Sequence, residues 1–229
     1  MKFSYYAHIY QIGELFIMKY KHIVFDIDGT LMDTEYAVLK SLQETLIQVT
    51  GEEKPFEALT FSLGIPGEAA LEQLGMEDIT ETMILWKEIF SKYLADSKIF
   101  DGIADLLNQL QQMNCHLGIV TSKTRDILEK DFCKTEIVKF FTTIICADDT
   151  VTHKPTPAPL LKYMELTGAK KEEILYIGDS IYDSQCAHNA HVDFALAVWG
   201  SHTKETPAEY YPETPQDLQT LFRILTPES

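Results

Sequence analysis

Hydrophobic residues in this chain occur in two patterns that alternate along it. Short, nearly continuous apolar runs cover residues 22–25, 116–121, 142–147 and 174–177, and polar or small residues follow each of them. Runs of this length predict strands that are buried on both faces, as in a parallel sheet. Between the runs, apolar residues recur every three or four positions, which predicts helices. The alternation predicts a three-layer, Rossmann-like α/β core with a parallel sheet.

A long stretch with helical spacing separates the first apolar run from the second. It predicts two amphipathic helices, one that ends at Gly51 and one with an apolar stripe over residues 79–93. Between them, residues 63–67 (Leu-Gly-Ile-Pro-Gly) form either a plain helix connection or a loop that approaches a ligand. We therefore predict an all-helical cap over residues 33–99, inserted into a core formed by residues 18–32 and 100–229.

Residues 1–17 precede this core and differ from it in character. They are aromatic and mixed in polarity, and their apolar runs are too short for a secretory signal or a membrane span. We expect an N-terminal extension, with a small helix packed on the core as the alternative.

The first apolar run ends in two carboxylates. Asp26 and Asp28 follow Phe25, and Gly29 then lets the backbone turn at once. Ligands of open α/β sheets bind at the carboxyl ends of the strands, and alternating side chains would place both carboxylates on one face. The alternative is an ordinary turn, for which Asp, Gly and Thr are common residues.

Polar residues also follow the second and third runs. Thr121 and Ser122 stand beside a predicted helix start, where hydroxyl and backbone N–H groups can bind a phosphate oxygen. Helix capping by Ser122 would use the same geometry. Lys154 follows the third run, and Pro155 favours an extended backbone at that point. Such a lysine binds an anion if it points inward, whereas most lysines are surface charges.

The fourth run ends in a second pair of carboxylates, Asp179 and Asp183. With Asp26 and Asp28 they are expected at the same edge of the sheet. Carboxylate oxygens are suitable ligands for Mg²⁺, which shares its remaining positions with water and substrate phosphate. The sequence therefore predicts a Mg²⁺ site among these four residues.

Composition limits the partners of the protein. The net charge of −16 disfavours a nucleic acid or an anionic membrane as the main partner, because both need a basic surface. With 229 residues, 45% of them hydrophobic, the chain can bury a substantial core. The four cysteines are widely spaced, which favours reduced thiols and a cytoplasmic location.

Four segments, in this order, resemble the signatures of the haloacid dehalogenase (HAD) superfamily of phosphatases. They are Asp26-Ile27-Asp28-Gly29-Thr30-Leu31, Thr121-Ser122-Lys123, Lys154-Pro155, and Gly178-Asp179-Ser180 with Asp183. The resemblance covers residues 21–200, and the insert is similar to the helical cap of phosphoglycolate phosphatase-like and pyrophosphatase-like members. The segment 198–200 (Val-Trp-Gly) resembles the strand end of those members, whereas their Ala-Gly pair appears here as Ala-His at 190–191.

The resemblance agrees with a chemical role for the acids at the sheet edge. A carboxylate that attacks phosphorus forms an aspartyl-phosphate, and Asp26 is the best-placed nucleophile. Asp28 is then the general acid and base. The resemblance implies that Mg²⁺ binds to Asp26, to the backbone carbonyl of Asp28 and to Asp179. Asp183 is expected either to bind the metal through water or to support Lys154.

The phosphate would be held by Thr121, Ser122 and Lys154, the role of Thr121 being implied by the resemblance. We expect a Mg²⁺-dependent phosphatase that hydrolyses a small phosphorylated metabolite, as a monomer or homodimer. The alternatives are a sugar-phosphate mutase of the same fold and a non-catalytic phosphometabolite-binding protein. A mutase needs a firm second phosphate site in its cap, yet Arg125 and Arg223 both lie outside it. Cap lysines such as Lys54, Lys87 and Lys92 could substitute as point charges, but the long helix of Lys87 and Lys92 favours a solvated face, and hydrolysis is therefore favoured.

Overall fold

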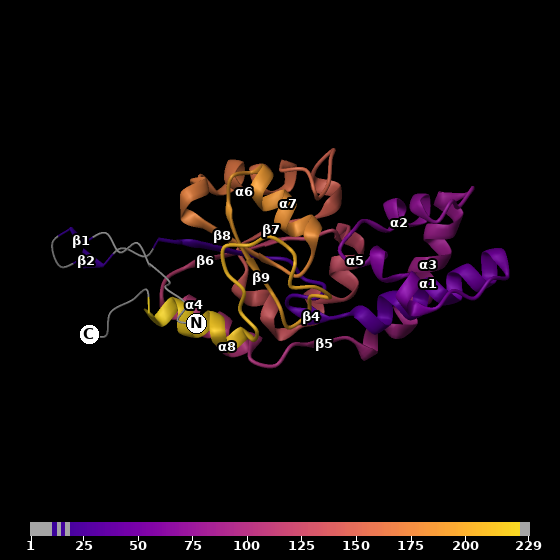
Figure 1. Cartoon of the computed structure of the whole chain (residues 1–229), viewed down its shortest axis with the longest axis horizontal. Helices are drawn as coiled ribbons and strands as arrows, with labels where there is room; N and C mark the ends of the chain where they lie inside the picture. Colours follow the sequence, from indigo (N-terminus) through magenta and orange to yellow (C-terminus); the bar gives the residue numbers. More distant parts are fainter. Residues whose placement is uncertain (1–10, 13–14, 17–18, 225–229) are drawn as a thin grey trace.

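A five-stranded parallel sheet forms the centre of the computed structural model, which describes residues 11–12, 15–16 and 19–224 (Figure 1). Its strands, in spatial order, are β7 (Thr143–Ile145), β6 (His116–Val120), β3 (His22–Phe25), β8 (Ile174–Gly178) and β9 (Asp193–Leu196). The register pairs Phe25 with Ile119 on one side and with Ile177 on the other. Residues that follow these three strands therefore emerge at one edge of the sheet.

Helices cover both faces of the sheet, as the sequence predicts. One face carries α4 (Ile103–Gln112) and α8 (Pro215–Ile224), and the other carries α6 (Ala158–Thr167) and α7 (Ile181–Asn189) (Figure 1). Strand β3 is apolar on both sides: Ile23 and Phe25 belong to the core beneath α4 and α8, and Val24 to the core beneath α6 and α7. The predicted three-layer α/β core is confirmed.

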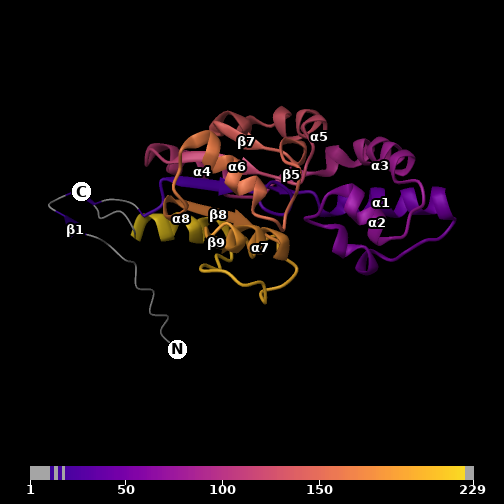
Figure 2. The same ribbon diagram turned by 90° about the horizontal axis from the view of Figure 1, so that it is seen from above.

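The cap consists of α1 (Glu35–Thr50), α2 (Gly67–Gln73) and α3 (Ile79–Tyr93), and it extends from one end of the core (Figure 2). These helices enclose a separate hydrophobic core that includes Leu42, Leu71 and Trp86. Helix α1 ends where predicted, because Gly51 adopts a left-handed φ of 74° and donates its N–H to Ile47 O. Two short antiparallel strands, β4 (Met32–Asp33) and β5 (Lys98–Ile99), form the two crossings between cap and core.

The remaining elements are short. Helix α5 (Arg125–Lys130) lies at the end of the core that faces the cap (Figure 1). The 3₁₀ helices are η1 (Phe56–Ala58), η2 (Thr60–Ser62), η3 (Leu94–Asp96), η4 (Phe132–Lys134), η5 (Glu136–Phe140), η6 (Ala147–Asp149) and η7 (Lys171–Glu173). Of the N-terminal extension, only β1 (Gln11–Ile12) and β2 (Leu15–Phe16) are described, and they pair antiparallel. Most of residues 1–17 lies outside the described part. In the described part, no helix is both long and apolar enough to cross a membrane.

Two predicted segments end differently in the structure. The third strand stops at Ile145, because the Asp149 carboxylate accepts the Cys146 N–H at 2.8 Å and the chain turns into η6. Residues 198–200 form a turn after β9 and are not part of the strand, since the Gly200 N–H bonds back to Ala197 O at 3.1 Å.

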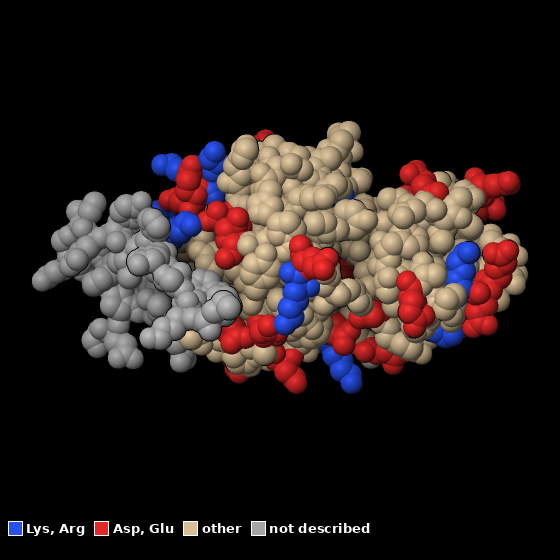
Figure 3. All heavy atoms as spheres, viewed as in Figure 1, with Lys and Arg blue, Asp and Glu red and all other residues tan. Residues whose placement is uncertain are grey.

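Charged side chains lie mainly on the surface. Figure 3 shows acidic side chains on both the core and the cap, with basic side chains scattered between them. Positive charge for binding an anion must therefore come from a local site within the molecule.

Candidate active site

The loop after β3 carries Asp26 and Asp28 and is shaped by close backbone contacts. Gly29 has a φ of 72°, and a Cβ atom there would overlap the Asp179 carboxylate. A Cβ atom at Gly200 would overlap the carbonyl oxygen of Gly29. Trp199 Nε1 also donates a hydrogen bond to Thr30 O at 2.9 Å. The turn after β9 thus holds the loop after β3 in place.

Three of the four predicted carboxylates gather at the edge of the sheet. Oxygen atoms of Asp26, Asp179 and Asp183 lie within 4.8 Å of one another, and all three residues are buried. Asp26 follows β3 directly, Asp179 follows β8, and Asp183 lies in the first turn of α7. The parallel register of β3 and β8 brings Asp26 next to Asp179 and Asp183.

Lys154 lies among these acids, with its side chain only 1% exposed. Its Nζ lies 3.0 Å from Asp26 Oδ1 and 2.6 Å from Asp183 Oδ1. Asp183 also accepts a hydrogen bond from the Tyr176 hydroxyl at 2.8 Å, while its Oδ2 accepts from Ser180 N at 3.1 Å and Ser180 Oγ at 2.5 Å. Both oxygens of Asp183 are therefore occupied by donors of the protein.

Burial and crowding of like charges determine the electrostatics of the cluster. Burial, reinforced by Asp183 and Asp28, raises the pKa of Asp26 to about 7, although Lys154 opposes this shift. The pKa of Asp179 is raised well above its ordinary value, again by burial first and then by Asp183 and Asp26. Burial alone would lower the pKa of Lys154, but Asp183 and Asp26 outweigh it and keep the ammonium charged.

The Asp28 carboxylate is directed elsewhere. Its Oδ1 accepts a hydrogen bond from Thr34 Oγ1 at 2.7 Å and lies 2.8 Å from Lys123 Nζ. Lys123 is itself buried and lies 2.7 Å from Asp131 Oδ2, with the Phe90 ring of the cap 5.5 Å from the ammonium. Burial lowers the pKa of Lys123, but Asp28 and Asp131 outweigh it and raise the value. Sequence reasoning gave Lys123 no role, and its only signal was its place beside Thr121 and Ser122.

The hydroxyls after β6 are not helix caps. Helix α5 has Thr124 at its N-cap position, and Ser122 Oγ instead donates to Gly64 O of the cap at 3.1 Å. Thr121 is buried at the strand end, and its Oγ1 accepts the Lys123 N–H at 3.2 Å. The cap segment 63–67 thus touches the core beside the predicted phosphate-binding residues, and a Cβ atom at Gly64 would come within 2.9 Å of Ser180 Oγ.

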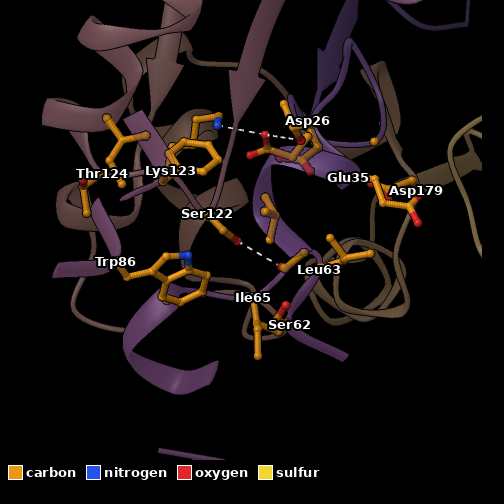
Figure 4. Close-up of a pocket in the computed structure, with 18 of the residues that line it drawn as sticks. Asp26, Glu35, Ser62, Leu63, Ile65, Trp86, Ser122, Lys123, Thr124 and Asp179 are labelled. Atoms are coloured by element: carbon orange, nitrogen blue, oxygen red, sulfur yellow. Dashed lines mark hydrogen bonds and ion pairs between the residues drawn. The ribbon is translucent and has the colours of Figure 1, made fainter. Parts of the chain in front are cut away.

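A pocket between core and cap contains these groups (Figure 4). Its empty space of about 980 Å³ includes open solvent at its mouth. Asp26, Asp28, Ser122, Lys123 and Asp179 line its core side. In the view of Figure 4, Leu63, Ile65 and Trp86 of the cap lie below them. Thr121, Lys154 and Asp183 are buried and are not among the lining residues.

The acidic cluster fits a hard divalent cation. Asp26 Oδ1 is buried without a hydrogen bond of good geometry, and Lys154 is the cation that contacts it among the described residues. Carboxylate oxygens are the ligands that Mg²⁺ prefers, and Asp26 and Asp179 are the members with free oxygen positions. The Asp28 side chain does not belong to this group, so its predicted participation is through the backbone carbonyl.

Comparison with known proteins gives consistent results. The family model described as haloacid dehalogenase-like hydrolase matches residues 23–197. "Pyrophosphatase PpaX" of Oceanobacillus iheyensis is 30% identical over 89% of this chain and 97% of its own length. "Phosphoglycolate phosphatase" of Aquifex aeolicus is 28% identical over 78% of this chain and 84% of its own length. The crystal structure of a "putative phosphoglycolate phosphatase" from Lactobacillus plantarum covers 90% of this chain and 100% of its own, with a TM-score of 0.83 and 31% identity. The predicted resemblance is confirmed.

Proposed function

The chain belongs to the haloacid dehalogenase-like hydrolases and is a phosphatase-type enzyme, and from this premise we propose that it hydrolyses a small phosphorylated metabolite with Mg²⁺ through an aspartyl-phosphate. The observation that carries the proposal is the buried cluster of Asp26, Asp179 and Asp183 around Lys154, at the carboxyl edge of the sheet. The relatives named as a pyrophosphatase and a phosphoglycolate phosphatase support the same class of reaction.

The proposed reaction proceeds in two displacements at phosphorus. In the first, an oxygen of Asp26 attacks phosphorus while the bond to the leaving oxygen breaks, and Asp28 gives that oxygen a proton. In the second, a water molecule gives a proton to Asp28 and attacks phosphorus, which breaks the bond to Asp26 and releases phosphate. Asp28 suits this task because its carboxylate lines the pocket while Thr34 and Lys123 fix its position.

The other residues hold the reactants. We assign Asp26, Asp179 and the backbone carbonyl of Asp28 to Mg²⁺, which when bound offsets the negative charge of carboxylates and phosphate. Lys154, with Thr121 and Ser122, is assigned to the phosphate oxygens. Asp183 is assigned to positioning Lys154, because donors of the protein already occupy both of its oxygens.

Substitution of single carboxylates tests this proposal. Asp26→Asn and Asp179→Asn are each expected to abolish phosphate release from a panel of phosphorylated metabolites, with circular dichroism showing an intact fold. Asp105→Asn is the matched control, because Asp105 is exposed on α4, away from the pocket. Excess chelator should inactivate the wild type, and added Mg²⁺ should restore it. Full activity in excess chelator would exclude the metal-dependent mechanism.

The mutase alternative depends on a second phosphate site in the cap. Among the described cap residues, Lys87 is the basic side chain that lines the pocket, and a single ammonium lacks the bidentate geometry of an arginine. A non-catalytic binding protein would need neither a nucleophile nor an acid, whereas this pocket presents both Asp26 and Asp28.

A further inference from the structure

The wall of the pocket that faces away from the carboxylate cluster is apolar. It is built by the cap helices α1 and α3, by the cap segment 63–67 and by α5 of the core. The apolar side chains in it are Val38, Leu63, Ile65, Met83, Trp86, Phe90 and Ile127. Trp86 is fixed there, since its Nε1 donates to Ser41 Oγ at 2.9 Å. A substrate bound at Asp26 would place its leaving group against this wall.

Of the three basic side chains in the described pocket lining, two contact carboxylates of the protein. Lys123 is paired with both Asp28 and Asp131. His202 Nε2 lies 3.5 Å from the Glu35 carboxylate, which also lines the pocket. Lys87 is the remaining basic side chain of the described lining, and Glu35 and Glu68 bring two carboxylates to the same lining.

Neither arginine of the sequence lies in the cap. Arg125 Nη2 is held by Asp149 at 2.6 Å and by Ile144 O at 3.3 Å. Arg223 lies on α8, which packs beside α4 on the core. An anionic leaving group would therefore meet Glu35 and Glu68 without a bidentate partner, and burying an uncompensated charge is costly.

We infer that the leaving group of the substrate is uncharged and packs an apolar face against Trp86 and Phe90. This inference rests on the proposed phosphatase function and narrows its substrate class to phosphomonoesters of uncharged, partly apolar alcohols. Pyrophosphate, whose leaving group is phosphate itself, and phosphoglycolate, whose leaving group carries a carboxylate, are then poor substrates. The preference would distinguish this chain from the relatives named after those two compounds.

The test compares three substrates with the full chain and Mg²⁺: benzyl phosphate, phosphoglycolate and pyrophosphate. Benzyl phosphate and phosphoglycolate are both esters of primary alcohols, so their comparison isolates the charge and apolar surface of the leaving group. We expect kcat/KM for benzyl phosphate to exceed both other values at least about tenfold. An equal or higher value for phosphoglycolate or pyrophosphate would overturn the inference and leave the phosphatase function intact. Hydrolysis of none of the three, nor of a wider panel of phosphate esters, would overturn the proposed function and the inference with it.

A charge reversal in the cap provides an independent measurement. Glu68 lies in the first turn of α2 and is exposed, so Glu68→Lys leaves the cap core untouched. It should raise kcat/KM for phosphoglycolate relative to benzyl phosphate by about fivefold, because it replaces a negative charge near the leaving group with a positive one. Glu72→Lys is the matched control, since Glu72 is exposed on the same helix and does not line the pocket. Equal ratios in the two variants would contradict the assignment of Glu68 to the leaving-group side.

Discussion

Replacement of Lys123 by methionine tests the buried charge network beside the candidate acid. The Lys123 and Asp131 side chains are 5% and 2% exposed, and their charged atoms lie 2.7 Å apart. Methionine retains an unbranched apolar stem next to Phe90 but leaves the Asp131 carboxylate buried without its cation. Removing one partner of a buried ion pair costs about 3–5 kcal/mol in the free energy of unfolding. Asp131 can limit this cost by binding a proton, because burial already raises its pKa, so we expect about 3 kcal/mol.

For a chain of this size, about 3 kcal/mol corresponds to a fall in Tm of about 6–12 °C, measured by thermal unfolding followed by circular dichroism. Lys130→Met is the control, because the Lys130–Asp126 pair at 2.8 Å is exposed to solvent and contributes little to stability. The double variant Lys123→Met with Asp131→Asn should recover part of the loss, since the unpaired charge is gone. If Lys123→Met and Lys130→Met lower Tm equally, the network does not stabilise the fold.

Three further predictions concern the site itself. First, the raised carboxylate pKa values mean that the metal-free folded protein binds protons more tightly than the unfolded chain, so its stability falls as pH rises from about 4 to about 7. The increase in Tm caused by Mg²⁺ should therefore be larger at pH 8 than at pH 5.5, and scanning calorimetry showing equal increases would contradict proton competition at these acids. Second, Gly200→Ala should lower kcat about tenfold or more, because its Cβ displaces the Gly29 carbonyl. Gly75→Ala strains a backbone with a φ of 74° and so lowers stability, but its Cβ meets open space, and kcat should not change. Equal kcat values for the two variants would show that the contact is unimportant. Third, β-glucose 1-phosphate should yield free phosphate, and efficient conversion to glucose 6-phosphate without phosphate release would support the mutase instead.

Local sequence signals were sufficient for four of the five strands of the sheet and for three members of the carboxylate cluster, whereas β9 was not predicted. Apolar runs that end in acids predict strand ends, and parallel pairing carries Asp26 and Asp179 to the same edge. The end of α1 was also predictable, because glycine at position 51 is typical of a left-handed helix terminus. These features depend on neighbours in sequence or on one strand pairing, which is why pattern analysis finds them.

The contacts of Asp28 and Ser122 could not be predicted in the same way. Asp28 turns toward Lys123 because Asp131 fixes that ammonium from a different element, and no spacing in the sequence relates the three. Ser122 bonds to Gly64 only because the cap docks onto the end of the core. Both contacts arise from packing between segments that are distant in the chain. The sequence pattern therefore identified the carboxylates of the candidate site, but it did not predict the contacts that hold Asp28.

A chain with a net charge of −16 can bind phosphate only where a local positive charge compensates its carboxylates. Asp26, Asp179 and Asp183 share one buried cation, Lys154, so their ionised forms leave an excess of negative charge at the sheet edge. Lys123 does not compensate this excess of negative charge, because its ammonium is already paired with two carboxylates, those of Asp28 and Asp131. A phosphate dianion therefore has no favourable electrostatic site here unless a divalent cation already occupies the carboxylates. The charged side chains on the cap side of the pocket are Glu35, Glu68 and Lys87, so the carboxylates outnumber the ammonium there and the cap side does not favour an anion. The scissile phosphate, and not a charged leaving group, is then the part of the substrate that the electrostatics orient.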